Sequence, residues 1–375
     1  MNKKDNHPLI VFSISLKSYI LISIALIALI VSLYICTKPM IAELAYRKAY
    51  FISEYSLKQP KYFSRYKYAI EEYEKASRHY PWETHYTVMM NKDIERYLAV
   101  MKDSNEKLKL INKALNSYAT VQQLDPVNPW YYSRISALQN RLAFELRDSQ
   151  PKLAKNILKD ASENTRKAAQ IDYENPIFLE NYANFLDFNK RYTEALYYYK
   201  KCTEIDKNYF NSNMKMASIY ISLKHYELAL NAYKNAKKTI VSYLRLPKSH
   251  KLYKKAVKYK DINYKILKLL IKMKDYNQAL AYFNDHNKDD HTTIKFSGLG
   301  GYLFYLLNDY RKSYILLDYF YNNTEDNIYI QLYTDLLVQV NSKDKIIKKL
   351  SRILNFKSIS EENKKYVQSK LNAYK

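Results

Sequence analysis

A 34-residue period links several segments of this chain. Four pairs of equivalent residues lie 34 positions apart, namely Ala183 and Ala217, Tyr192 and Tyr226, Ala195 and Ala229, and Tyr199 and Tyr233. The same block returns at residues 275–283 and, 34 positions later, at residues 309–317. Small residues let two helices approach closely, and aromatic side chains fill the gap to the next pair. The period therefore predicts helix pairs that must stack, because no pair buries its apolar face alone.

Earlier parts of the chain keep much of the same pattern. Its small, aromatic and proline positions return twice, at Ala69, Tyr73, Ala76 and Pro81, and at Ala114, Tyr118 and Pro126. Together these residues resemble the tetratricopeptide repeat family over most of residues 50–360. The resemblance implies an all-α chain, an α-solenoid of about eight helix pairs that binds proteins and is not an enzyme. The copies begin near Tyr50, Thr84, Pro129, Pro176, Phe210, Lys260, Ile294 and Ile328.

The composition favours the same fold class. Only 3 of the 375 residues are glycine and 9 are proline, whereas β-rich and nucleotide-binding folds need more turn glycines. Gly300 and Gly301 fall where the repeat places its apolar–small pair, so close packing explains them better than a phosphate-binding loop. The two cysteines supply no disulfide framework and no zinc site.

The stretch from Tyr19 to Cys36 holds 18 residues without a charge and is rich in isoleucine and leucine. As a helix it would extend about 27 Å, close to the ~30 Å hydrocarbon core of a bilayer. The alternative is a cleaved signal peptide, but no small-x-small pair follows, and the bulky Ile35 before Cys36 argues against a lipobox. We therefore expect a single-pass membrane helix.

This helix sets the expected organisation of the chain. We expect a short tail at 1–18, the transmembrane helix at 19–36, the repeats at 37–360 and a capping helix or tail at 361–375. Lys3, Lys4 and Lys17 precede the span, which favours a cytoplasmic N-terminus and repeats outside the cytoplasm at the cell membrane. Lys38, Arg47 and Lys48 follow the span and weaken this orientation.

A basic insert interrupts the repeat spacing. Phe210 and Lys260 lie 50 residues apart, and the excess falls at about 244–259. From Arg245 to Lys274 there are eleven lysines or arginines against one acid, within a chain of net charge +24. This segment predicts a partner that is an acidic polymer or an anionic lipid headgroup. Its candidate basic patch is Lys251, Lys254, Lys255 and Lys258.

The first helices of the repeats predict a groove for a protein segment. Its candidate residues are Glu180, Asn184, Asp187, Asn211, Met214, Ser218, Tyr264, Lys268, Tyr302 and Tyr305. Glu180 stands where the family's clamp for chaperone tails needs a lysine, so that ligand is not implied. Tyrosines interleaved with lysines could stack on nucleic-acid bases. Many of the 41 tyrosines occupy repeat-core positions, however, so core packing explains them first and we do not expect the chain to bind nucleic acid.

No catalytic or cofactor site is expected, because the chain has no nucleophile elbow, no H-E-x-x-H motif and no Walker loop. The acidic and histidine residues at 285–291 are typical of a turn between repeats and not of a metal site. The segment from Leu124 to Tyr132 also resembles, over a short stretch, the repeats of O-antigen ligase and polymerase proteins. Three hypotheses stay open: a membrane scaffold, an accessory factor in cell-surface polysaccharide assembly, and an anion binder.

Overall fold

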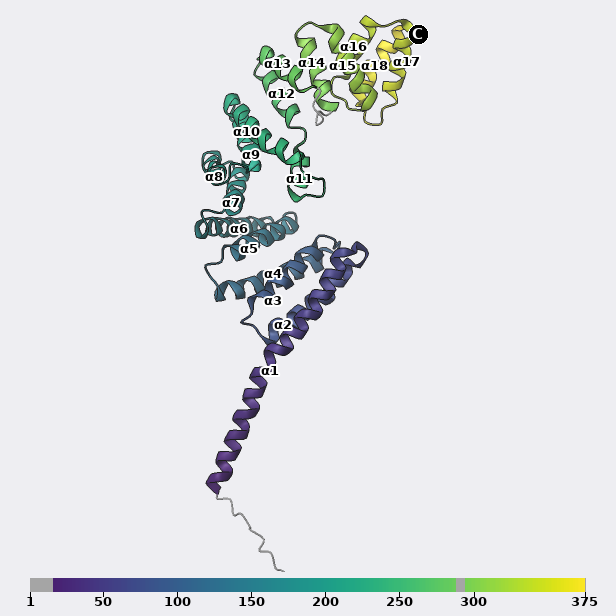
Figure 1. Cartoon of the computed structure of the whole chain (residues 1–375). Helices are drawn as coiled ribbons and strands as arrows, with labels where there is room; N and C mark the ends of the chain where they lie inside the picture. The colour runs from purple at the N-terminus through teal and green to yellow at the C-terminus, as the bar shows by residue number, and fades with distance from the viewer. Residues whose placement is uncertain (1–15, 288–293, 375) are drawn as a thin grey trace, which may run out of the picture. The chain divides into compact units, whose positions relative to one another are not determined.

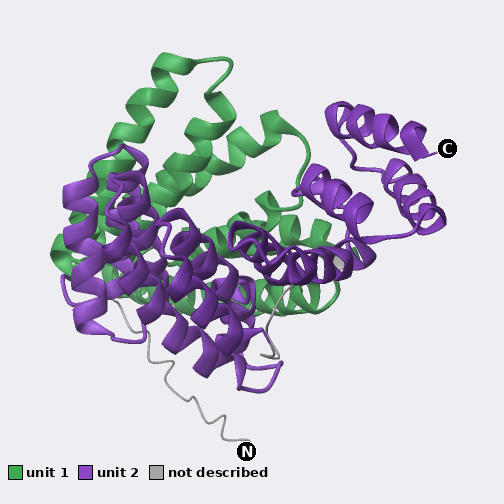
Figure 2. Cartoon of the chain, turned by 90° about the horizontal axis from the view of Figure 1, so that it is seen from above, with its two compact units in different colours: residues 1–172 green, residues 173–375 purple. Residues whose placement is uncertain are grey.

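The computed structural model describes residues 16–287 and 294–374 (Figure 1). Within those ranges the regular elements are helices, and no strand occurs. The chain divides into two compact units, residues 1–172 and 173–375, which are coloured separately in Figure 2. The prediction of an all-α chain is confirmed.

The first helix, α1 (Leu16–Lys58), contains two parts that differ in burial. Large apolar side chains from Tyr19 to Ile35 are exposed, and among the described residues α1 alone is long and apolar enough to cross a membrane. A signal sequence has the same composition. From Ala42 onward, the same helix packs against α2 (Tyr66–His79), with Ala42, Ala49 and Ser53 buried.

The first repeat therefore begins inside α1, about eight residues before the start near Tyr50 that the sequence indicated. Pro39 lies inside the helix and does not end it. As a result, the apolar segment and the first repeat share one continuous helix.

Unit 1 is a stack of three antiparallel pairs. The second half of α1 pairs with α2 through the short helix η1 (Pro60–Arg65), α3 (Thr84–Leu98) with α4 (Ser104–Leu124), and α5 (Pro129–Leu146) with α6 (Pro151–Ile171). Local signals begin these helices. The side chains of Glu83, Asp103 and Asn128 accept backbone N–H bonds at the starts of α3, α4 and α5, and prolines open α5 and α6.

Unit 2 contains five further pairs. They are α7 (Pro176–Phe188) with α8 (Tyr192–Ile205), α9 (Phe210–Ser222) with α10 (Tyr226–Leu244), α12 (Ile262–Lys272) with α13 (Tyr276–His286), α14 (Ile294–Leu306) with α15 (Tyr310–Asn323), and α16 (Ile330–Val340) with α17 (Lys343–Leu354). A last helix, α18 (Glu361–Tyr374), packs on α16 and α17. Between α10 and α12 lie α11 (Lys251–Ala256) and η2 (Val257–Tyr259). The described residues thus hold eight pairs, as the sequence predicted.

Small residues lie at the close contacts between paired helices. Ala183, Ala195, Ala217 and Ala229 are all fully buried. A Cβ atom on Gly300 would lie 2.1 Å from the Phe283 ring, and one on Gly301 would lie 2.8 Å from Leu317. These helices approach so closely that only a hydrogen atom fits at both glycines, which confirms the packing explanation for this pair.

Four of the first helices in unit 2 end in the same turn. Lys190, Lys224, Lys274 and Asn308 have φ of 60°, 61°, 63° and 62°. In each case the next residue donates its N–H to a carbonyl five residues earlier, for example Arg191 to Leu186 at 2.9 Å and His225 to Tyr220 at 2.8 Å. This is the Schellman motif, which ends a helix with one left-handed residue. The sequence carries no glycine at these sites, so this feature was not predicted.

Candidate functional site

The first helices α7 and α9 of unit 2 place polar side chains side by side. Glu180, Asn184 and Asp187 share one face of α7, because residues three and four apart lie on the same side of a helix. Asn211, Lys215 and Ser218 lie three and four residues apart and so share one face of α9. We call these six residues the first-helix face. The Lys215 ammonium lies 3.9 Å from the Asp187 carboxylate, so the two rows adjoin.

Two tyrosine hydroxyls hold this face in place. The Tyr209 hydroxyl donates to Glu180 at 2.9 Å, and the Tyr199 hydroxyl donates to the Asn184 side-chain oxygen at 2.7 Å. Tyr199 is itself fully buried in the repeat core. The buried aromatic position of the repeat therefore also orients an amide on the first-helix face.

Glu180 is the electrostatic centre of this face. Burial raises the pKa of the Glu180 carboxyl above its ordinary value, although the Tyr209 hydroxyl, Lys255 and Lys215 act in the opposite direction. The Lys255 ammonium also lies 5.1 Å from the centroid of the Tyr209 ring. The sequence treated the groove and the basic patch as separate candidates, and the structure brings Lys255 and Glu180 together.

The insert that carries Lys255 packs on α9 and α10. Phe210 contacts the Tyr259 ring edge-on at a centroid distance of 5.2 Å, and Ala256 is fully buried. The other three members of the basic patch, Lys251, Lys254 and Lys258, are exposed. All four lysines of the patch are therefore exposed, and one of them, Lys255, acts electrostatically on Glu180 of the first-helix face.

A second group of candidates lies on α12 and α14 and is aromatic. Tyr302 stacks on Tyr329 at a centroid distance of 5.3 Å, and the Lys268 ammonium lies 5.9 Å from the centre of the Tyr264 ring. Burial raises the pKa of Tyr264 above its ordinary value. Tyr305 is exposed at 39% and contacts Tyr310.

Tyr329 was missed by the sequence analysis. It precedes α16 with φ of 69°, in a copy too degenerate for alignment, so no sequence signal marked it.

One candidate differs from its expected place. Met214 is only 8% exposed, since it faces the helix contacts of the repeat, and it offers little surface to a ligand. Ser218 and Lys268 are exposed, whereas Glu180, Asn184, Asp187, Asn211, Tyr264 and Tyr302 are partly buried. Whether these residues bind a ligand stays a prediction.

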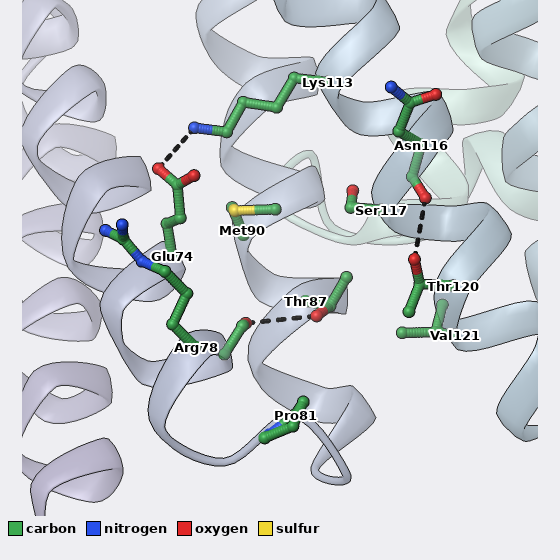
Figure 3. Close-up of a pocket in the computed structure, with 11 residues that line it drawn as sticks. Glu74, Arg78, Pro81, Thr87, Met90, Lys113, Asn116, Ser117, Thr120 and Val121 are labelled. Carbon is green, nitrogen blue, oxygen red and sulfur yellow. Dashed lines mark hydrogen bonds and ion pairs between the residues drawn. The ribbon is translucent and has the colours of Figure 1, made fainter.

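Unit 1 has a separate hollow of about 630 Å³ between α2, α3 and α4, which the sequence analysis did not indicate (Figure 3). On one side Lys113 pairs with Glu74 at 2.7 Å. The Ser77 and Thr87 hydroxyls share a hydrogen bond of 3.2 Å. Met90 supplies apolar lining, and the remaining lining side chains are mostly polar. The lining therefore offers polar contacts beside a small apolar surface.

No group of three or more metal-ligating side chains occurs among the described residues. Part of the 285–291 segment considered for a metal, together with residues 292 and 293, lies outside the described ranges. Burial raises the pKa of the Cys202 thiol to about 11, which keeps it protonated at neutral pH.

Comparisons with known proteins give structural neighbours only. No family model matches the chain, and no curated relative matches it. The solved structures that resemble it include TTC0263, a thermophilic TPR protein of Thermus thermophilus, with 17% identity and a TM-score of 0.38 over 58% of this chain and 97% of that one. YrrB, a TPR protein with an unusual peptide-binding site, has 14% identity and a TM-score of 0.39 over 56% and 99%. A tetratricopeptide repeat protein of Parabacteroides merdae has 15% identity and a TM-score of 0.39 over 77% and 99%.

At these TM-scores the fold assignment depends on the chain's own helix pairs, on the 34 residues between the starts of α8 and α10 and of α13 and α15, and on the buried alanines. The fold is of the tetratricopeptide-repeat type. The described residues contain its paired helices, its small residues at the helix contacts and its recurring buried aromatics.

Proposed function

We propose that this chain is a membrane-anchored scaffold that binds a segment of another protein along the first-helix face of unit 2. The observation that carries the proposal is the adjoining pair of polar rows on α7 and α9. Together they carry two carboxylates, two amides, one ammonium and one hydroxyl, and two tyrosine hydroxyls hold Glu180 and Asn184 in position. Such groups supply donors and acceptors for a peptide backbone, and the tyrosines of α12 and α14 supply apolar contacts.

The anchor is supported by α1. Its exposed apolar part is long enough to cross a bilayer, and the helix continues without a break into the first repeat. Tyr19 and Tyr34 stand near the two ends of the apolar segment, with Lys17 and Lys38 beside them, as is typical of a membrane span. An anchor confines binding to the membrane surface and raises the effective concentration of a partner there. The proposed topology places the N-terminus in the cytoplasm.

Site-specific photo-crosslinking tests the binding face. A photoreactive amino acid is placed at Asn184 or at Tyr302, and matched variants carry it at Tyr197 or Tyr319. Both control positions are exposed aromatics on second helices, at 54% and 52%. The proposal expects the two first-helix positions to capture the same protein from native membranes. The control positions should not capture it. Equal capture from all four positions, or capture from the controls alone, would contradict a specific face.

The exposed lysines of the insert support a second candidate function, the binding of an acidic polymer or anionic headgroups. Each lysine near such a surface contributes on the order of 1 kcal/mol, screened by salt. The variant Lys251→Glu/Lys254→Glu is compared with Lys234→Glu/Lys238→Glu, which changes the charge equally on the exposed side of α10. Selective loss of salt-sensitive binding to heparin or to phosphatidylglycerol vesicles in the first variant would support this function. Equal loss of binding in both variants would mean that the binding depends on net charge alone and not on these two lysines.

A role in cell-surface polysaccharide assembly stays an alternative without structural support. The segment from Leu124 to Tyr132 that suggested it forms the end of α4, a turn and the start of α5. Asn128 caps α5 there by accepting from the Trp130 N–H at 3.1 Å. A helix start explains this motif without a polysaccharide ligand.

A further inference from the structure

The turn between α2 and α3 presents a tryptophan to solvent. Trp82 is 72% exposed in the segment that joins His79, the last residue of α2, to Thr84, the first residue of α3. A single exposed aromatic is ordinary on a protein surface. Its position in unit 1 is what distinguishes this one, since Figure 1 shows the turn beside the place where α1 leaves the helical stack.

Contacts between α1 and α2 fix the height of this turn along α1. Ala42 packs with Ala76, and the Lys48 ammonium pairs with Glu72 at 2.9 Å. Residue numbers therefore fall on α2 as they rise on α1, so the helices are antiparallel. Tyr80 follows Ala76 by four residues, and four residues of helix correspond to about 6 Å. The turn therefore lies about one helical turn closer to the apolar segment than Ala42 does.

The other side of the turn is tied to α1 as well. The Tyr86 hydroxyl donates to Glu43 at 3.3 Å, and the Tyr46 hydroxyl and the His85 ring share a hydrogen bond of 3.1 Å. Both ends of the turn are thus held against residues 42–46. Ala42 is six residues beyond Cys36, or about 9 Å along the helix. Trp82 is consequently held near the level of Lys38, within a few ångströms of the end of the apolar segment.

That level has the chemistry of a membrane interface. The headgroup layer on each side of the hydrocarbon core is about 5–8 Å thick. Tryptophan and tyrosine concentrate in it, because one end of the ring system is apolar and the other donates hydrogen bonds. Tyr34 is 62% exposed with the Lys38 ammonium 4.5 Å from its ring centre, and Arg78 and His79 at the end of α2 are exposed. Met40 on α1 is also exposed, at 60%.

From this placement we infer that the α2–α3 turn is an interfacial docking surface for the phospholipid bilayer that α1 spans. The Trp82 ring enters the headgroup layer, and Lys38 faces the lipid phosphates. Docking at the turn gives unit 1 a second attachment beside the anchor and restricts its tilt on the membrane. The inference rests on the proposed anchor and adds a named contact to it.

The chain is well suited to a test, because it has only two tryptophans, Trp82 and Trp130. The Trp130→Phe variant keeps Trp82 as the sole tryptophan, and the matched Trp82→Phe variant keeps Trp130 at the start of α5, one repeat further along the stack. Each full-length protein is reconstituted into phosphatidylcholine–phosphatidylglycerol vesicles that contain lipid brominated near the headgroup end of the acyl chain. Flotation of the vesicles after carbonate washing first measures the fraction of protein that is anchored.

We expect the anchored Trp130→Phe protein to lose most of its tryptophan emission in brominated vesicles and to emit at shorter wavelength than in detergent. The Trp82→Phe protein should lose little. A floated protein with unquenched Trp82, or equal quenching of both tryptophans, would overturn the docking surface and leave the anchor standing. A protein that fails to float would overturn the anchor and this inference together.

Discussion

Two equivalent tyrosines of the repeat differ in a way that predicts opposite mutational effects. Tyr73 and Tyr199 occupy the same repeat position, four residues after a buried alanine, and both are fully buried. The Tyr199 hydroxyl donates to Asn184 at 2.7 Å. The Tyr73 hydroxyl has no hydrogen-bond partner among the described residues. Replacement by phenylalanine removes one oxygen at each site and leaves the ring packing unchanged.

The expected magnitudes follow from these contacts. A net intramolecular hydrogen bond contributes about 0.5–1.5 kcal/mol, so Tyr199→Phe should destabilise the α7–α8 pair by about 1 kcal/mol. A buried hydroxyl without a partner costs about 1–3 kcal/mol, so Tyr73→Phe should stabilise the α1–α2 pair by about 1 kcal/mol. Each effect corresponds to a roughly five-fold change in the local opening equilibrium, since about 1.36 kcal/mol is tenfold.

Hydrogen exchange read by mass spectrometry is the suitable assay, because stacked repeats open locally and a single global transition is not expected. In the detergent-solubilised full-length chain, α8 peptides of Tyr199→Phe should exchange about five-fold faster and α2 peptides of Tyr73→Phe about five-fold slower. Tyr197→Phe, at an exposed position, should change neither. If Tyr73→Phe accelerates exchange in α2, its hydroxyl is bonded in solution and the reasoning from the buried contacts is refuted.

Three further substitutions test the packing, the turns and the charges. Gly300→Ala should destabilise the α12–α15 region by about 1–2 kcal/mol, because the new methyl group overlaps the Phe283 ring. Adding Phe283→Leu should restore part of the lost stability in thermal melts. If it restores none, the Phe283 ring is not the obstacle. Lys224→Gly should stabilise its turn by about 0.5 kcal/mol, because the backbone φ of 61° suits glycine. The control Lys200→Gly, inside α8, should destabilise its helix by about 1 kcal/mol. Faster hydrogen exchange in both variants would exclude a left-handed Lys224. A hydrogen bond from Lys75, with a further one from Lys48, lowers the pKa of Glu72 in the folded protein. The Glu72 carboxylate therefore stabilises the fold above its ordinary pKa of 4.5, and this contribution is lost as pH falls through the lower folded value. Glu72→Gln should flatten the pH dependence of thermal melts between about pH 3 and 7, and parallel curves for the two proteins would contradict this expectation.

The candidate site was only partly accessible to the sequence. Periodicity placed Glu180, Asn184 and Asp187 on one helix face, because helix geometry fixes which neighbours align. It could not place Lys255 beside Glu180, because the two are 75 positions apart and an insert of irregular length joins them. Tyr329 was missed for a related reason, since its copy had lost the residues that reveal the register.

The amino-acid pattern by itself determined the helix pairs, their number and the small residues at their contacts. These features follow from residue spacing within a single repeat, and local periodicity specifies them directly. Tertiary structure alone decided that the apolar segment and the first repeat share one helix, and that Trp82 returns to the level of Lys38. The reason is physical: the register between two antiparallel helices is set by which side chains interlock across them, and Ala42 with Ala76 fixes that register here.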